Sequence, residues 1–404
     1  MSTDSSSGSV KWTQLLVKRG GALVAIAAIA ITILWGFYLF RYSARPPGHE
    51  MSDSLTTYIQ DAIRYGGVHS ALLSLVIPRL VHFLPESYLY GLANVTIASS
   101  GGRATFLLGH LYPTGQWFYF PIAFTIKCTL AFLLLLVLIA VATSQMWGEK
   151  KRETIFLLFP AAVFLGLSLT SHLNIGIRHI LPIYPFLIVL AAGAASWLAR
   201  RKRAWMWAVA ALAGLHCVSS LRAFPDYRSY SNELWGGPMR TFHFLASANV
   251  DTGGGLIDES NFLKHNRIRD CWIAPFGSGD LAYYGISCKV LPALSPRKGS
   301  AVVPRPVEGT LLVSTSVMAG AMWGPPELNP YGPLWHEKPS ANLGGHTLVF
   351  QGRFDLLLLS AASHSIEAQG LASQGHLDDA LVEARIAVEM APQQMQHISL
   401  SPRF

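Results

Sequence analysis

Lys127, Arg178 and His179 are the residues of this sequence best placed to do chemistry, because all three lie in or beside long apolar runs. Lys127 falls about ten residues into its run, where a charged group is costly in lipid and is often functional. Arg178 is the only strong cation of a short polar turn. If the two runs pack together, Lys127 and Arg178 would bind a lipid-linked phosphate through charge-assisted hydrogen bonds. The alternatives are a lysine that snorkels to the headgroups along its aliphatic stem and an ordinary interfacial arginine.

The acidic residues give a weaker signal. Asp251, Asp258 and Glu259 flank a glycine run, and we interpret them as members of a solvated loop. No two carboxylates have the spacing of a general acid and base, and the run DTGGG lacks the lysine of a phosphate-binding loop. No Cys or His residues have metal-ligand spacing. We therefore predict no catalytic residue, no metal and no cofactor from these residues.

The cysteines fall in two kinds of position. Cys128 and Cys217 lie within apolar runs, where a free cysteine packs as a small apolar residue. Cys271 and Cys288 flank the turn-rich segment GSGDLAYYG, so the chain between them can return on itself. A disulfide between these two is permitted outside the cytoplasm. Two free exterior thiols are the alternative.

Five apolar runs must position these residues, and they decide the class of protein. A run that crosses about 30 Å of hydrocarbon must be a helix, because lipid offers no partner to a free backbone amide. The runs indicate a membrane α-helical protein with about five transmembrane helices. Two runs are near the lower length limit, which leaves four spans as the alternative. The spans are expected near residues 22–40, 118–143, 155–170, 180–199 and 204–220.

Basic clusters predict the orientation of these spans. They precede the first run, separate the second from the third and separate the fourth from the fifth. The positive-inside rule places them and the N-terminus in the cytoplasm, and it places the 41–117 loop and the chain after about residue 220 outside. The formal net charge of +8 is thus an orientation signal, and we expect no nucleic-acid partner. The clustered residues are Lys11, Lys18, Arg19, Lys150, Lys151, Arg152, Arg200, Arg201, Lys202 and Arg203.

The composition divides the chain into four parts. Residues 1–20 form a Ser-rich tail that we expect to be disordered, and residues 21–220 form the transmembrane region. From 221 to 357, Gly, Pro, Asn and Asp become frequent and short β-like runs appear, which predicts a small exterior α/β domain. Its strands are expected in CWIAPF, KVLPAL, TLLVSTSV and HTLVFQ, and a helix is expected in GPMRTFHFLASANV.

Residues 358–404 are expected to form a helical hairpin and a tail. Between Ala361 and Gln394 the small and turn residues have the spacing of one tetratricopeptide repeat. Such repeats stack in several copies to bury a continuous core. A single hairpin docked on its own domain is therefore the favoured interpretation, and a protein-binding array is the alternative.

Several segments resemble, in order, one family: the multi-spanning bacterial glycosyltransferases of the protein-O-mannosyltransferase and lipid-A aminoarabinose-transferase type. GHLYPTGQWFYFPIAFTIKCTLAFLLLLVL resembles the span that carries the family's aromatic, proline and lysine signature. LNIGIRHILPIYPFLIV resembles its turn and following helix. YSNELWGGPMRTFHFLASANVDTGGGL and APFGSGDLAYYGI resemble two successive exterior blocks, and WGFYLFRYSA looks like the end of a central span. These segments cover roughly residues 35–290.

The resemblance implies a scaffold that takes a sugar from a polyprenyl phosphate on the exterior face. Lys127 and Arg178 match the family's residues at their positions. The exterior block supplies four further matching positions: Asn232, Glu233, Asn249 and Asp251.

Other positions depart from the family pattern. His179 stands where the family has Tyr, and Thr129 where it has Pro; Thr252 and Gly254 replace the Trp and Gln that follow the exterior aspartate. The family's catalytic aspartate lies in its first exterior loop, whereas this chain begins where the middle of the family would be. We therefore expect no matching aspartate in residues 1–404.

Together these observations predict a partial or diverged lipid-phosphosugar-dependent glycosyltransferase scaffold in the bacterial inner (plasma) membrane. The implied partners are a polyprenyl-phosphate sugar or another membrane lipid, a separately encoded N-terminal half, and a protein bound through the C-terminal hairpin. The alternative is a non-enzymatic membrane scaffold whose exterior domain binds a partner. A transporter is disfavoured because the apolar runs hold few charges and show no internal repeat.

Overall fold

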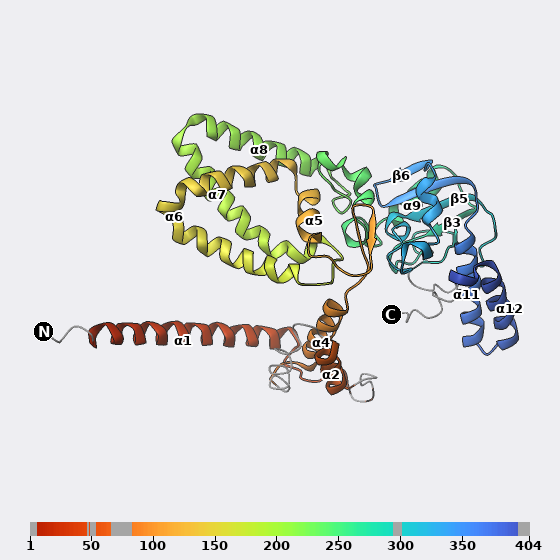
Figure 1. Ribbon diagram of the computed structural model, residues 1–404, viewed down its shortest axis with the longest axis horizontal. Coiled ribbons are helices and arrows are strands. Elements are labelled where there is room, and N and C mark those ends of the chain that lie inside the picture. Colours follow the sequence, from red (N-terminus) through yellow and green to blue (C-terminus); the bar gives the residue numbers. More distant parts are fainter. Residues whose placement is uncertain (1–5, 47, 49–53, 66–82, 294–300, 395–404) are drawn as a thin grey trace. The chain divides into compact units, whose positions relative to one another are not determined.

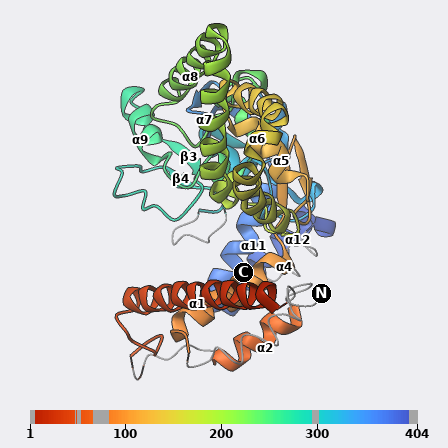
Figure 2. The same ribbon diagram turned by 90° about the vertical axis from the view of Figure 1, so that its left-hand side faces the viewer.

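A computed structural model describes residues 6–46, 48, 54–65, 83–293 and 301–394. The chain divides into two compact units, Met1–Gly101 and Gly102–Phe404. Figures 1 and 2 show the elements of each unit. The α-helices are α1 (Ser6–Phe37), α2 (Leu55–Tyr65), α4 (Glu86–Gly101), α5 (Tyr119–Lys127), α6 (Leu130–Leu169), α7 (Tyr184–Arg201), α8 (Arg203–Arg222), α9 (Leu256–His265), α10 (Thr315–Met318), α11 (Leu357–Ser373) and α12 (Leu377–Met390). The strands are β1 (Thr105–Leu107), β2 (His110–Tyr112), β3 (Cys271–Ala274), β4 (Lys289–Val290), β5 (Val307–Ser314), β6 (Ala341–Leu343) and β7 (Thr347–Phe354).

The first unit contains α1, α2 and α4. Because α1 begins at Ser6, it includes most of the 1–20 segment that the sequence predicts as a disordered tail. A helix nucleated in the apolar run extends towards the N-terminus at little cost when no proline intervenes. In the predicted 41–117 loop, α2 and α4 pack around Leu55 and Leu89. Residues 66–82 of that loop lie outside the described residues.

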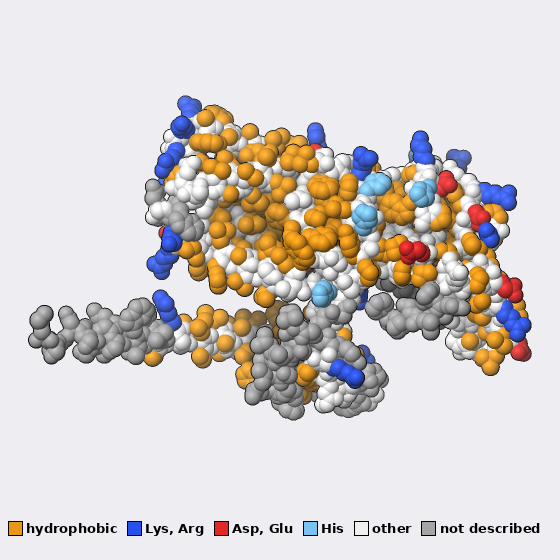
Figure 3. Space-filling model, viewed as in Figure 1, with side chains coloured by type: hydrophobic (Ala, Val, Ile, Leu, Met, Phe, Trp, Pro, Cys, Tyr) orange, Lys and Arg blue, Asp and Glu red, His pale blue; other side chains and the backbone are white. Residues whose placement is uncertain are grey.

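Within the described residues, four helices are long and apolar enough to cross a membrane, and a bent pair makes a fifth candidate. α8, which is described throughout, buries none of its side chains. Figure 3 shows hydrophobic side chains over the outer surface of α6, α7 and α8. The coarse prediction of a helical chain with membrane-length helices and a small sheet is therefore confirmed. The candidates are Val17–Phe37, Lys150–Leu169, Ile177–Arg201 and Arg203–Arg222, with Tyr119–Lys127 plus Leu130–Gln145 as the bent pair.

The run 118–143, which the sequence predicts as one transmembrane helix, is instead two helices. α5 and α6 meet at an angle of 114°. Tyr119 and Phe120 of α5 lie in the same buried cluster as Leu311 of β5 and Phe350 of β7. The prediction of one continuous helix is wrong, because the chain bends between α5 and α6 and the buried side chains of α5 pack in the core of the α/β domain.

α6 then continues to Leu169 and joins the runs predicted as the second and third spans. Its one break is at Lys150, where φ is −126° and ψ is 23°. Each half of α6 contains enough residues to extend about 30 Å at 1.5 Å per residue. No separate loop therefore divides these two runs in the described chain.

The α/β domain is built on a five-stranded sheet with the strand order β4-β3-β5-β7-β6. β3 runs parallel to β4 and β5, whereas β7 is antiparallel to β5 and β6. All four residues of β3 are buried, as their apolar character requires. β3, β4, β5 and β7 lie where the sequence predicts strands, whereas β6 is not predicted.

The helix predicted in GPMRTFHFLASANV is wrong. Two short 3₁₀ turns, Pro238–His243 and Ser247–Asn249, occupy this segment. The turns are separated because Ala246, between them, is extended (φ −133°, ψ −171°) and Ser247 has a φ of 58°, and neither conformation belongs to an α-helix.

α11 and α12 form the predicted helical hairpin at the end of the described chain. Its small residues Ala361, Ala387 and Ala391 pack together with Leu328 of the α/β domain. The hairpin is therefore docked on its own domain.

A groove with Lys127 at one end as the candidate functional site

Asn232 makes the break that separates α5 from α6. Its side-chain amide donates to the carbonyl oxygens of Thr125 (2.6 Å) and Cys128 (2.8 Å), and its backbone N–H donates to the carbonyl of Ile126 (3.0 Å). These are the last carbonyls of α5, which have no partner within the helix. Asn232 is fully buried. Its donors thus take the place of the N–H groups that a continued helix would offer to these carbonyls.

Lys127, the last residue of α5, points into the loops of the α/β domain. Its Nζ donates to the backbone carbonyls of Arg228 and Asn249, the latter at 2.8 Å. An ammonium group has three donors, so one remains for a ligand. The predicted position of Lys127 about ten residues into a span is therefore wrong. Lys127 is half-buried and lies at the bend between α5 and α6.

Asn249 connects Lys127 to the start of the next helix. Its side-chain oxygen accepts from the backbone N–H of Ile177 (2.9 Å), and its amide donates to the hydroxyl of Tyr119 (2.6 Å). Three separate segments therefore meet at this one buried residue. The predicted exterior position Asn249 is a packing and hydrogen-bonding centre.

A groove of about 650 Å³ begins at Lys127 and runs between α6, α7 and α8. Most of its lining is apolar; Phe132, Leu135, Ile188 and Val209 are examples. Its polar lining groups include Lys127, Thr129, His216, Tyr227 and Tyr230.

Thr129 and His216 add a second donor to the groove. The hydroxyl oxygen of Thr129 caps α6 by accepting from the N–H of Phe132 (3.1 Å), and it lies 2.7 Å from Nδ1 of His216. When the hydroxyl hydrogen is donated to Nδ1, the other ring nitrogen Nε2 carries a hydrogen and can donate in turn. Lys127 and His216 then both present hydrogen-bond donors in the groove lining.

Arg178 and His179 lie on the 3₁₀ helix Ile177–Ile183 that precedes α7. Arg178 is exposed, and the Nε2 atom of His179 is buried without a partner in the described chain. Neither is among the described residues that line the groove. The structure therefore connects Arg178 to Lys127 only indirectly, through Ile177 and Asn249.

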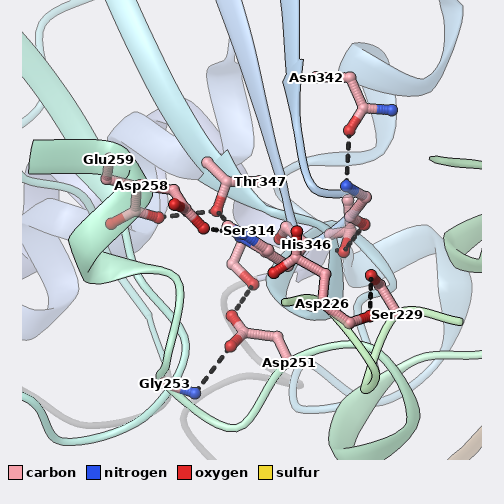
Figure 4. A network of polar contacts seen from close by, with 12 residues as sticks. Asp226, Ser229, Asp251, Gly253, Asp258, Glu259, Ser314, Asn342, His346 and Thr347 are labelled. Atoms are coloured by element: carbon pink, nitrogen blue, oxygen red, sulfur yellow. Dashed lines mark hydrogen bonds and ion pairs between the residues drawn. The ribbon is translucent and has the colours of Figure 1, made fainter. Parts of the chain in front are cut away.

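The two predicted exterior carboxylates have structural partners. Glu233 accepts a hydrogen bond from the hydroxyl of Ser219 in α8 (3.1 Å). Asp251, 4% exposed, accepts from the hydroxyl of Ser314 (2.9 Å) and from the N–H of Gly253 (2.7 Å). Figure 4 shows Asp251 directed at Ser314 in β5.

The solvated-loop interpretation is wrong for Asp251 and Glu259. α9 begins directly after the glycine run, and its first turn directs Glu259 at Thr347 of β7 (2.7 Å). Burial raises the pKa of Glu259 to about 7. Only the tertiary contact of α9 with the sheet explains this burial, because the local sequence is polar.

Cys271 and Cys288 form the disulfide that the sequence allows, with their Cα atoms 4.7 Å apart. Cys128 and Cys217 are free; Cys128 is buried as predicted, whereas Cys217 is exposed on α8.

Thr129 and His216 are the groove residues that the sequence did not single out as a site. A histidine within an apolar run is itself a signal. Its partner Thr129 lies 87 residues earlier in the chain, however, so no local pattern connects them.

The fold is that of a helical chain with membrane-length helices and an α/β domain. A mostly apolar groove lies between three of the helices and has a cation at one end. Comparison of the chain with protein-family models, with curated proteins and with solved structures found no match.

Proposed function

We propose that this chain is a membrane protein that binds a polyprenyl-phosphate lipid in the groove, as the donor-binding scaffold of a lipid-phosphosugar-dependent glycosyltransferase. One observation carries the proposal: the 650 Å³ groove is apolar along its length and has Lys127 at one end. An amphiphile with one long apolar tail and one anionic headgroup fits this distribution of polarity.

The headgroup, rather than the tail, must provide selectivity. Bilayer lipid is as apolar as the groove lining, so a tail gains little free energy by moving from the bilayer into the groove. A phosphate gains charge-assisted hydrogen bonds from Lys127, and the ring N–H of His216 can contribute another. We therefore expect an anionic lipid to bind in preference to a neutral lipid of equal length.

The groove binds a donor without supplying a general base. Among the described residues that line it, none is a carboxylate. Glycosyl transfer to a hydroxyl acceptor uses a positioned base, so the proposal concerns donor binding and not turnover by these side chains. The direct test is accordingly a binding measurement.

The experiment compares binding of a polyprenyl-phosphate probe to the purified full chain and to variants in nanodiscs. Lys127→Ala should weaken binding by about 1–3 kcal/mol, the range for hydrogen bonds to charged groups. Ala213→Phe fills the groove while it keeps Lys127, and should weaken binding as well. Ala211→Phe is the matched control, since Ala211 is exposed on α8 and is not among the described lining residues.

The control also separates folding from binding. Unfolding temperatures of the Ala213→Phe and Ala211→Phe variants should agree, because both add a ring to the exposed surface of α8. Probe binding that is unchanged by both Lys127→Ala and Ala213→Phe would contradict the proposal and favour a non-enzymatic scaffold. Arg178→Ala tests the phosphate contact implied by the family resemblance, and the groove geometry predicts a smaller loss than for Lys127→Ala.

A further inference from the structure

A second group of metal-binding side chains lies in the α/β domain. Asp226, Asp258 and His346 each offer one ligand atom, and these three atoms lie within 4.8 Å of one another. Asp226 follows α8, Asp258 lies in α9, and His346 directly precedes β7. In Figure 4 the three side chains converge from these separate segments. The described groove lining includes none of them.

The hydrogen bonds around His346 determine which ring nitrogen carries a hydrogen. The hydroxyl of Thr347 donates to Glu259 (2.7 Å), so its oxygen is an acceptor towards Nδ1 of His346 at 3.2 Å. With Glu259 ionised, Nδ1 donates to that oxygen, and Nε2 of a neutral ring presents a lone pair. Nε2 lies 3.0 Å from Oδ2 of Asp258. A nitrogen and a carboxylate oxygen at this distance can share a proton or bind one metal ion as adjacent ligands.

Next to this pair is a small polar cavity of about 40 Å³, lined by Asp226, Asp251, Arg228 and His346 among others. This volume is enough for roughly one water molecule or one small ion. Among its lining residues, the carboxylates of Asp226 and Asp251 outnumber the single guanidinium of Arg228, so the cavity favours a cation.

Two glycines keep side chains away from the same position. A Cβ atom on Gly344 would lie 2.8 Å from Oδ2 of Asp226 and 2.9 Å from Nε2 of His346. A Cβ on Gly255 would lie 2.5 Å from Nδ1 of His346. Any larger residue would therefore displace the candidate ligands.

We propose that Asp226, Asp258 and His346 bind one divalent transition-metal ion of the Zn²⁺ class. Imidazole nitrogen with carboxylate oxygen is a ligand set that suits Zn²⁺, and the Nδ1–H···Thr347···Glu259 chain is the outer-shell support such a histidine ligand uses. The ion joins the loop after α8 to α9 and to β7. Asp226 is two residues from Arg228, whose carbonyl accepts a hydrogen bond from Lys127. The proposal does not depend on lipid binding.

The test is Zn²⁺ binding to the full chain in detergent after removal of metal with EDTA, followed by calorimetry and metal analysis. The wild-type chain should bind one Zn²⁺ and unfold at a higher temperature with it. Asp226→Asn and His346→Ala should weaken binding at least about tenfold, and Thr347→Val about 10- to 100-fold. His364→Ala is the matched control, since His364 pairs with Glu383 in the hairpin; it should bind as the wild type does.

Asp258→Asn distinguishes a metal from a proton at this position. An asparagine amide can donate to Nε2 and so removes the need for any cation. This variant should lose Zn²⁺ binding, yet in EDTA it should unfold at a temperature no lower than the wild type does. A wild-type chain that binds no Zn²⁺ would overturn the proposal and leave a protonated His346–Asp258 pair. Zn²⁺ binding unaffected by Asp226→Asn and His346→Ala would overturn it equally.

Discussion

At the residue scale, two buried asparagines, rather than charged residues, make the hydrogen bonds that join distant segments around the site. Asn232 and Asn249 are 0% and 1% exposed, and their amides contact backbone groups or hydroxyls far away in sequence. An asparagine carries both donors and an acceptor without the cost of burying a charge. These two residues thus hold Lys127 where it is, at the end of the groove.

Replacing Asn232 with Asp tests this role. A carboxylate cannot donate to the carbonyls of Thr125 and Cys128, so we expect the free energy of unfolding to fall by about 1–3 kcal/mol. Chemical denaturation of the detergent-solubilised chain measures the change. Asn266→Asp is the control, because Asn266 donates to a carbonyl on an exposed surface. Equal losses in the two variants would show that the break does not depend on Asn232.

At the element scale, the break between α5 and α6 depends on backbone geometry that proline also adopts. Thr129 has a φ of −61° and a ψ of 145°, and Cys128 before it is extended. Proline fixes φ near −65° and favours an extended residue before it. Thr129 therefore stands at a position where a proline could equally end one helix and start the next.

We therefore expect Thr129→Pro to fold with a stability within about 1 kcal/mol of the wild type. The lost N-cap costs about 1 kcal/mol, and the stiffer unfolded chain returns about 0.4–1 kcal/mol. Ala123→Pro, in the buried interior of α5, should cost about 3 kcal/mol or more. Denaturation midpoints compare the two variants. If the Thr129→Pro chain were as unstable as the Ala123→Pro chain, the backbone at residue 129 would not be suited to proline, and the prediction would fail.

At the scale of the whole molecule, the turn between α6 and α7 belongs to the same side as the α/β domain. The carbonyl of His172 accepts hydrogen bonds from the backbone of Arg103 and Gly115, and Ile177 is bound to Asn249. The break at Lys150 and the α7–α8 turn lie at the other ends of these helices, where Lys150 and Arg200 line one cavity. Figure 3 shows Lys and Arg side chains gathered at this end.

If these helices span a membrane, this arrangement predicts one orientation, with the basic ends in the cytoplasm. Reporter fusions after residues 150, 175, 202 and 300 should report inside, outside, inside and outside. The physical reason is that clustered Lys and Arg beside spans are retained on the cytoplasmic side. An inside signal after residue 300 would contradict the prediction and require one span fewer.

The apolar runs and the strands could be predicted from the sequence, because each depends on a local pattern of side chains. The break at Lys127 could not, since it depends on Asn232, more than 100 residues later. The same limit applies to Asp226, Asp258 and His346. These three residues are far apart in the sequence, so a search for metal-ligand spacing does not find them. The segment GGH, directly before β7, is only a weak local sign of a site.

The sequence by itself determined that this chain has helices of membrane length, a small α/β domain and a C-terminal hairpin, and it allowed the disulfide between Cys271 and Cys288 that the structure shows. Hydrophobicity over a helix length and residue periodicity are local properties, so the sequence states them directly. Only the tertiary structure decided that α5 is domain core, that Lys127 meets the groove with His216, and that Asp251 and Glu259 are buried. Those outcomes depend on contacts between distant segments, and such contacts override local polarity.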